Sequence, residues 1–246
     1  MKNKKRILSI ILGLLAVSLG YFAWSKWASA TRIALVNFPN YQVSNMALSN
    51  EDNFIKFEEV PLDQLDKLKN YDFVLAWGMG IKIDENQRNT IIQTAEKVPT
   101  HFVSVTSPEN DISSLSESQS EKVDSYLSSG NKKNFQSFAR YVRKYIDGKK
   151  FFAEEPEKVI EKKENVFFHI DEEVAFSDIK TYEDYLKKNN LYQEGKPKIA
   201  IVSGIHDPFS GNKAHIDSII VSLQKSGLNV YPFASFGKRV EFLEQI

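Results

Sequence analysis

Cysteine is absent from this sequence. Its absence excludes disulfide bonds, thiolate metal sites and a cysteine nucleophile. Hydrophobic residues make up 42% of the 246 residues, which is enough for a folded core and too many for a disordered chain. The length allows one or two domains.

A net charge is also lacking, but the charges are unevenly placed. All 32 acidic residues lie in residues 31–246 together with 27 of the 32 basic ones, so this part carries a net charge of −5. Residues 1–30 hold the other five basic groups and no acid. Because the larger part is mildly acidic and has no basic patch, we do not expect nucleic acid as a partner.

Two common catalytic fingerprints are incomplete. Gly78 and Gly80 follow an apolar run, as in a dinucleotide-binding loop, but Ile83 stands where the third glycine is needed. No G-x-S-x-G elbow surrounds Ser203, so Ser203, His206 and Asp207 are not interpreted as a hydrolase triad.

The N-terminal segment contains a long apolar run. Residues 7–24 carry no charged side chain, and as a helix they span roughly 27 Å, close to the hydrocarbon core of a bilayer. Tyr21, Trp24 and Trp27 gather at the far end, where amphipathic rings favour the membrane interface. Residues 1–30 are therefore predicted to be a single-pass anchor in the cell inner membrane. Because the basic head should stay in the cytoplasm, residues 31–246 are expected on the periplasmic side.

A cleaved signal peptide is the alternative for this segment. Ala28-Ser29-Ala30 fits a cleavage site. The apolar run is longer than the roughly 7–15 residues typical of a signal peptide, which favours the anchor. Both interpretations place residues 31–246 outside the cytoplasm.

Strand and helix patterns alternate in residues 31–150. Apolar runs predict strands at 32–37, 71–77 and 101–105, and helical patterns lie at 63–69, 84–97, 117–128 and 132–146. Such alternation is typical of parallel βαβ units. We therefore predict a first α/β domain at 31–150, with a parallel flavodoxin- or Rossmann-like sheet and a helical extension.

A second α/β unit is expected at 198–246, after a connector at 151–197. Strand patterns at 198–203 and 229–233 enclose a helix that should end at Gly227. The sequence stops at Ile246 soon after this unit starts, and so few strands would leave a sheet edge and face uncovered. We therefore expect this last unit to be truncated and the native chain to be longer.

The candidate ligand contacts lie near the strand at 198–203. His206, Asp207 and His215 flank the loop after this strand, where α/β folds place ligands and where imidazole and carboxylate together suit a metal. A polar rim or a helix-capping role is the alternative for these residues.

His169 is the remaining candidate. It lies in VFFHIDEE, where strand alternation places it opposite Phe168 and toward solvent or a cleft. A contact to haem or a metal and an ordinary strand-end role are both open for it.

Three stretches resemble the large subunit of cobaltochelatase and magnesium chelatase, the CobN-like family. VDSYLSSGNKKNFQSFARYVRKYI (123–146) is similar to the YL..GG..N...L..YL segment of that family. TYEDYLKKNNLY (181–192) resembles a later helix, and residues 196–237 resemble the strand, Asn-containing loop, helix and strand that follow it, with Asn212 as the loop asparagine. Gly130-Asn131 replaces a double glycine, and His206-Asp207-Pro208 replaces a loop that usually holds tyrosine or arginine.

This resemblance, over roughly residues 70–246, implies the N-terminal portion of a large protein that moves a metal into or out of a tetrapyrrole. The anchor makes the chain most similar to membrane-anchored HmuS-type relatives, which are associated with removing iron from haem during haem uptake. It also separates the domain from cytoplasmic ATP, which the soluble cobalt chelatases use. Cobalt insertion for cobalamin synthesis is the alternative.

The function that the resemblance implies also indicates a substrate, a metal and a set of contact residues. Haem or another tetrapyrrole is the expected substrate, with iron or cobalt as the metal, and the expected contacts are His169, His206, Asp207, Asn212 and His215. The main catalytic residues are expected beyond Ile246, so this part alone should be inactive. The expected partners are the membrane and either haem-uptake proteins or chelatase subunits.

Two functions of another class stay open. The α/β pattern alone also suits a stand-alone exported binding module, and an anchored domain also suits a tether that recruits a haem receptor.

Overall fold

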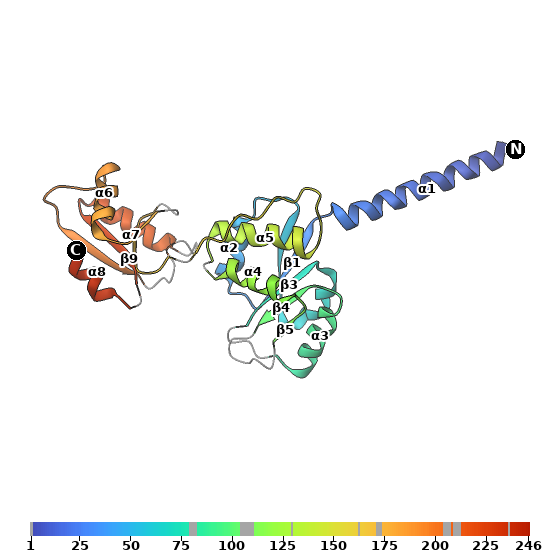
Figure 1. Ribbon diagram of the computed structural model, residues 1–246, viewed down its shortest axis with the longest axis horizontal. Helices are drawn as coiled ribbons and strands as arrows, with labels where there is room; N and C mark the ends of the chain where they lie inside the picture. The colour runs from blue at the N-terminus through green and yellow to red at the C-terminus, as the bar shows by residue number, and fades with distance from the viewer. Residues whose placement is uncertain are drawn as a thin grey trace. The chain divides into compact units, whose positions relative to one another are not determined.

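The computed structural model describes residues 2–78, 83–103, 111–128, 130–161, 163–170, 174–203, 208, 213–235 and 237–246. Within them the chain forms two compact units (Figure 1). The first unit comprises Met1–Val123 and Gln136–Glu157, and the second comprises Asp124–Phe135 and Lys158–Ile246.

The N-terminal helix α1 (Lys2–Trp27) contains the apolar run. Its segment Ile10–Trp27 is long and apolar enough to cross a membrane, and none of this segment is buried against the rest of the described chain. A signal sequence near the N-terminus can also meet this criterion of length and hydropathy, so the membrane assignment stays a prediction.

The first unit is built on a five-stranded sheet with the order β2-β1-β3-β4-β5. The strands are β2 (Ile55–Val60), β1 (Thr31–Val36), β3 (Phe73–Trp77), β4 (Thr100–Val103) and β5 (Ile112–Ser113). The first four are parallel, and β5 runs antiparallel to β4. The expected α/β fold with parallel strands is therefore confirmed, and its strand order is the one found in flavodoxin-like sheets.

Strand β2 and helix α2 (Asn40–Ser49) lie in a stretch where the sequence predicts neither element. β2 is an edge strand whose ends, Ile55 and Val60, are buried while the residues between them are partly or fully exposed. An edge strand that is open to solvent needs no continuous apolar run, so its signal in the sequence is weak.

Two helices contribute to the core on this sheet, η1 (Leu62–Asn70) and α3 (Glu85–Ala95). α3 begins where the sequence predicts. The Asp84 side chain accepts a hydrogen bond from the Gln87 N–H, and the Gln87 side chain accepts one from the Asp84 N–H. This reciprocal cap satisfies two of the N–H groups left open at the helix start, and Ile91 then contributes to the same hydrophobic core as Phe102.

Three helical segments follow: α4 (Glu117–Leu127), α5 (Lys132–Tyr141) and a π-helical turn, η3 (Val142–Ile146). Gly130 lies between the first two with a φ of +64°, the left-handed conformation that glycine adopts readily and that ends a helix. η3 continues α5 and carries Arg143, whose side chain is completely buried in the first unit.

The second unit has a four-stranded sheet with the order β7-β6-β9-β8. Its strands are β6 (Val166–Phe168), β7 (Ala175–Phe176), β8 (Lys198–Ser203) and β9 (Asn229–Ala234), and its later helices are α6 (Ile179–Lys188), α7 (Ala214–Lys225) and α8 (Arg239–Gln245). β8 and β9 are parallel, whereas β6 is antiparallel to both β9 and β7. α7 ends as the sequence predicts, because Gly227 follows it with a φ of +82°.

Helices cover both faces of this sheet. Phe167 on one face packs with Tyr182 of α6 and Phe242 of α8. Phe168 on the other face packs with Ile216 and Ile220 of α7. Neighbouring strand residues point to opposite faces, so two adjacent phenylalanines serve two separate cores.

The segment at 151–197, which we expected to be a connector, differs from that expectation. It contributes β6, β7 and α6 to the second sheet and its cover. The sheet that starts at 198 is therefore not left with an uncovered face, contrary to the reasoning from sequence. The sequence indicates strand alternation in VFFHIDEE but not the pairing of β6 with β9, because that pairing joins segments that are distant along the chain.

Candidate functional site

The loop between β8 and α7 contains most of the predicted contacts. Of residues 204–212 the structure describes only Pro208, so His206, Asp207 and Asn212 lie outside the described residues. Their ligand contacts stay predictions.

His215 lies in the first turn of α7, and its side chain is exposed to solvent. The next residue, Ile216, points into the core below the helix. Asp217 forms an ion pair with Lys213, with 3.0 Å between Oδ1 and Nζ. The helix therefore presents one imidazole outward while the nearby carboxylate neutralises a cation.

His169, which follows β6, is buried, with 2% of its surface exposed. The sequence had placed it toward solvent or a cleft, and the structure corrects this. Its Nε2 lies 2.9 Å from the amide nitrogen of Gln224, and its ring centre lies 5.6 Å from that of Tyr185. These contacts place the ring in the packing between β6 and its neighbouring helices. A ligand contact at His169 stays a prediction.

Lys213 connects the start of α7 to the end of β6. Its ammonium group donates hydrogen bonds to the carbonyl oxygens of His169 at 3.0 Å and Ile170 at 2.9 Å, besides its ion pair with Asp217. The residue is only 3% exposed, and these three acceptors compensate for the loss of water around its charge. Sequence reasoning missed it, although its spacing of four residues from Asp217 is typical of helical ion pairs.

In the first unit, the carboxyl ends of β1 and β3 form the edge at which sheets of this strand order bind ligands. Asn37 has a φ of +58° there and donates from Nδ2 to the Trp77 carbonyl at 2.9 Å. The rings of Phe38 and Trp77 lie 5.5 Å apart. These contacts join the two strand ends to each other, and residues 79–82, which include the Gly80 of the incomplete fingerprint, lie outside the described residues.

Without cysteine, a metal site of the protein's own would need a cluster of imidazole and carboxylate groups. Within the described ranges, no group of three or more His, Asp or Glu side chains is placed to hold a metal ion.

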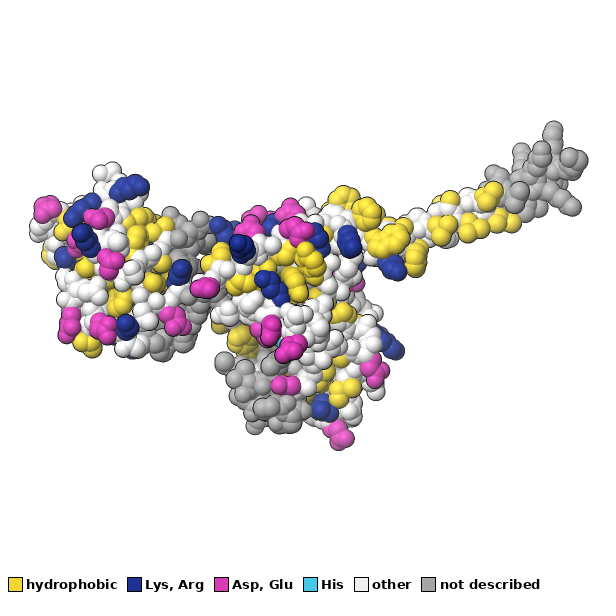
Figure 2. All heavy atoms as spheres, in the orientation of Figure 1, with side chains coloured by type: hydrophobic (Ala, Val, Ile, Leu, Met, Phe, Trp, Pro, Cys, Tyr) yellow, Lys and Arg dark blue, Asp and Glu magenta, His cyan; other side chains and the backbone are white. Residues whose placement is uncertain are grey.

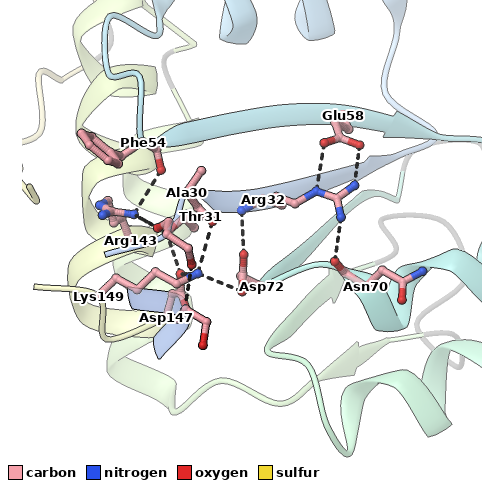
Figure 3. A network of polar contacts seen from close by, with 12 residues as sticks. Ala30, Thr31, Arg32, Phe54, Glu58, Asn70, Asp72, Arg143, Asp147 and Lys149 are labelled. Atoms are coloured by element: carbon pink, nitrogen blue, oxygen red, sulfur yellow. Dashed lines mark hydrogen bonds and ion pairs between the residues drawn. The ribbon is translucent and has the colours of Figure 1, made fainter. Parts of the chain in front are cut away.

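A network of buried charges holds residues 29–32, which follow α1, within the first unit (Figure 3). Arg143 is completely buried and donates from Nη1 to the carbonyl oxygens of Ser29 at 2.8 Å and Phe54 at 3.1 Å, and to the Thr31 hydroxyl at 3.1 Å. Its Nη2 donates to the Phe151 carbonyl at 2.7 Å. One guanidinium thus fixes the chain just after α1, just before β2 and after η3.

Lys149 and Asp147 extend this network to β1 (Figure 3). Lys149 is 3% exposed, and its Nζ lies 2.9 Å from Asp147 Oδ2 and 3.0 Å from Asp72 Oδ1. Thr31 donates to Asp147 at 2.6 Å, and the Arg32 N–H donates to Asp72 at 2.8 Å. The first residues of β1 are therefore held by side chains on both sides.

Burial raises the pKa of the Asp147 carboxyl above its ordinary value. The hydrogen bonds from Thr31 and Lys149 act in the opposite direction, and the negative charge of Asp72 adds to the rise. Arg32 of β1 donates two hydrogen bonds to Glu58 of the neighbouring strand β2, and these bonds lower the pKa of Glu58.

Comparison with known proteins places part of the chain in a family. The model of the family described as CobN/Magnesium Chelatase matches residues 124–246, which begin where the second unit begins. The solved catalytic subunit of cobaltochelatase from Mycobacterium tuberculosis is similar in fold, with a TM-score of 0.52 and 15% sequence identity. That similarity covers 87% of this chain and 17% of the cobaltochelatase chain, so this chain spans about one sixth of its length. Among curated proteins no match was found.

We expect Arg143→Met to destabilise the first unit by at least about 3 kcal/mol, because several buried acceptors lose their donor at about 1–3 kcal/mol each. Urea unfolding of the intact protein in detergent, followed by tryptophan fluorescence, measures this, since Trp24, Trp27 and Trp77 all lie in that unit. Arg140→Met is the matched control. Its ion pair with the exposed Glu154 should contribute less than about 1 kcal/mol. Equal losses for both variants would contradict the role given to Arg143.

Asp147→Asn should change the pH dependence of stability. A carboxyl whose pKa is raised on folding stabilises fully below its unfolded pKa of about 3.9, and this contribution is lost as the pH rises through the folded pKa. The free energy of unfolding of the variant, relative to the native protein, should therefore increase as the pH rises from about 4. Asp66→Asn controls for the loss of one exposed negative charge. If the difference in unfolding free energy between Asp147→Asn and the native protein stayed constant with pH, a raised pKa of Asp147 would be ruled out.

Lys213→Met should loosen the end of β6, because two carbonyl oxygens and the Asp217 carboxylate lose their partner. We expect amide hydrogen exchange at 166–168 to accelerate by about five- to thirty-fold, which corresponds to about 1–2 kcal/mol. Lys225→Met, an exposed position in the last turn of the same helix, should leave this exchange unchanged. Identical exchange in the two variants would show that Lys213 does not hold the strand.

Proposed function

The chain belongs to the CobN/magnesium chelatase family, and we propose that it acts as the N-terminal part of a membrane-anchored chelatase that removes iron from haem. The observation that carries this proposal is the family match over residues 124–246, which includes all of the second unit. The apolar segment Ile10–Trp27 supports an anchor in the inner membrane, with residues 31–246 on the periplasmic side.

The choice of haem rests on this anchor. A domain outside the cytoplasm has no access to cytoplasmic ATP. The removal of iron from haem replaces the metal on the pyrrole nitrogens by protons, which side chains can deliver, and ATP does not enter the balance of this step. This favours the HmuS type within the family, acting with haem-uptake proteins. The similarity to a cobaltochelatase favours the second candidate, cobalt insertion into a corrin ring with chelatase partner subunits.

We place the tetrapyrrole contact of the second unit at the start of α7. His101 and His169 are buried, so among the described histidines His215 presents its imidazole to solvent. Imidazole is a common ligand of haem iron. The hydrogen bonds of Lys213 fix the helix start that carries His215, and the loop with His206, Asp207 and Asn212 leads into it.

The test uses the native full-length protein in its membrane, supplied with haem or with a cobalt-free corrin and Co²⁺. Haem dechelation should release iron and produce the fluorescence of a metal-free porphyrin. Incorporation of cobalt into the corrin would instead support the second candidate. Failure to bind any tetrapyrrole would contradict both and favour a tether or a binding module for another ligand.

His215→Ala should weaken haem binding about ten-fold, which corresponds to about 1.4 kcal/mol. Absorbance titration in the haem Soret band measures the affinity. Ser218→Ala, an exposed position in the same helix, is the matched control and should bind like the native protein. Unchanged affinity in His215→Ala would remove this residue from the proposed contact.

A further inference from the structure

The loop at 148–153 in the first unit presents two adjacent phenylalanines to solvent. Phe151 is 59% exposed and Phe152 is 60% exposed. Large aromatic side chains are usually buried in a soluble domain, and a contiguous exposed pair indicates an interaction surface.

This loop is fixed to the end of α1 by hydrogen bonds. The same guanidinium, that of Arg143, donates to the carbonyl oxygens of Ser29 and Phe151. Lys149 donates to the Ala30 carbonyl at 3.3 Å. The backbone carbonyl groups of Phe151 and Ser29 therefore bind the same guanidinium group. Ser29 lies two residues beyond Trp27, the last residue of α1. This proximity holds whatever direction α1 takes when it leaves the unit.

The loop backbone holds the phenylalanines in this position at a cost. Phe152 has a φ of +55°, a left-handed conformation that is unfavourable by roughly 1–2 kcal/mol for a residue with a side chain. Its ring stacks on Phe54, with 4.6 Å between ring centres and an angle of 6° between planes. Strained residues of this kind are often found at functional positions.

The chemistry around the loop suits a lipid headgroup region. Tyr145 is 49% exposed and Lys150 is exposed, while at the end of α1 Trp24 is 52% exposed and Trp27 is 43% exposed. Amphipathic aromatic rings and lysines are the residues that favour the membrane interface. Figure 2 shows hydrophobic side chains on the surface where α1 joins the first unit.

We propose that the 148–153 loop is a second membrane contact, which inserts Phe151 and Phe152 into the interface of the leaflet where α1 ends. The occupant is the lipid bilayer itself, because the loop is hydrogen-bonded to the residues that follow the spanning segment. This contact rests on the anchor in the proposed function. It holds the first unit against the membrane surface and limits the orientations of the chain on its anchor.

The absence of cysteine allows a direct measurement of depth. The full-length chain is prepared with a single cysteine in place of Phe151, labelled with an environment-sensitive fluorophore and reconstituted into phosphatidylethanolamine–phosphatidylglycerol vesicles. Part of the lipid carries a doxyl quencher in its acyl chain. We expect the label at 151 to shift to shorter wavelength and to lose emission in the vesicles that contain the quencher.

Two further single-cysteine variants serve as references. Leu15→Cys lies within the predicted span and reports on the anchor itself. Asn86→Cys lies in the first turn of α3, at the opposite end of the first sheet from the 148–153 loop, and should not be quenched.

The outcomes separate the loop from the anchor. Quenching at 15 and 151 but not at 86 supports the proposal. Quenching at 15 alone overturns the loop contact and leaves the anchor intact, and it would favour a protein partner for the phenylalanines. Quenching at none of the three positions removes the anchor and the loop contact together. Equal quenching at all three contradicts an oriented contact through the loop.

Discussion

The guanidinium of Arg143 has no access to solvent and is surrounded by the carbonyl oxygens of Ser29, Phe54 and Phe151. Removing a cation from water is costly, and the planar group recovers that cost only when several acceptors converge on its N–H groups. The three acceptors belong to the end of the N-terminal segment, the start of β2 and the loop after η3. The entry of the chain into β1, the strand between β2 and β3, depends on this convergence.

The second unit uses the same principle on a smaller scale. Lys213 can be buried because two carbonyl oxygens beyond β6 and the Asp217 carboxylate accept hydrogen bonds from its ammonium group. This contact links strand β6 to the helix that follows β8, and these elements belong to the region that the chelatase family shares. A buried lysine that positions a helix start explains how an exposed His215 can have a defined location without a contact of its own to the core.

Local patterns in the sequence were sufficient for the elements that obey short-range rules. The parallel strands β1, β3 and β4 were found from apolar runs, the start of α3 from Asp84, and the end of α7 from Gly227. β2 was missed because an edge strand that is open to solvent lacks a clear period. The strand pattern in VFFHIDEE did not show that β6 belongs to the second sheet, because its pairing with β9 joins segments that are distant along the chain. His169 was misplaced for a related reason. Strand alternation predicts which face of the sheet a side chain points to, but not whether a helix covers that face. His169 is covered by contacts with Gln224 of α7 and Tyr185 of α6.

The sequence by itself determined the apolar N-terminal segment, the α/β class and the resemblance to the chelatases, because each depends on composition or on the order of residues along the chain. Only the tertiary structure decided which charged residues are buried. Arg143, Lys149 and Lys213 are ordinary basic residues in sequence, and their burial depends on acceptors that are distant along the chain, such as Ser29 for Arg143. The exposure of Phe151 and Phe152 was decided in the same way, since the hydrogen bonds that hold their loop beside the end of α1 come from contacts between remote segments.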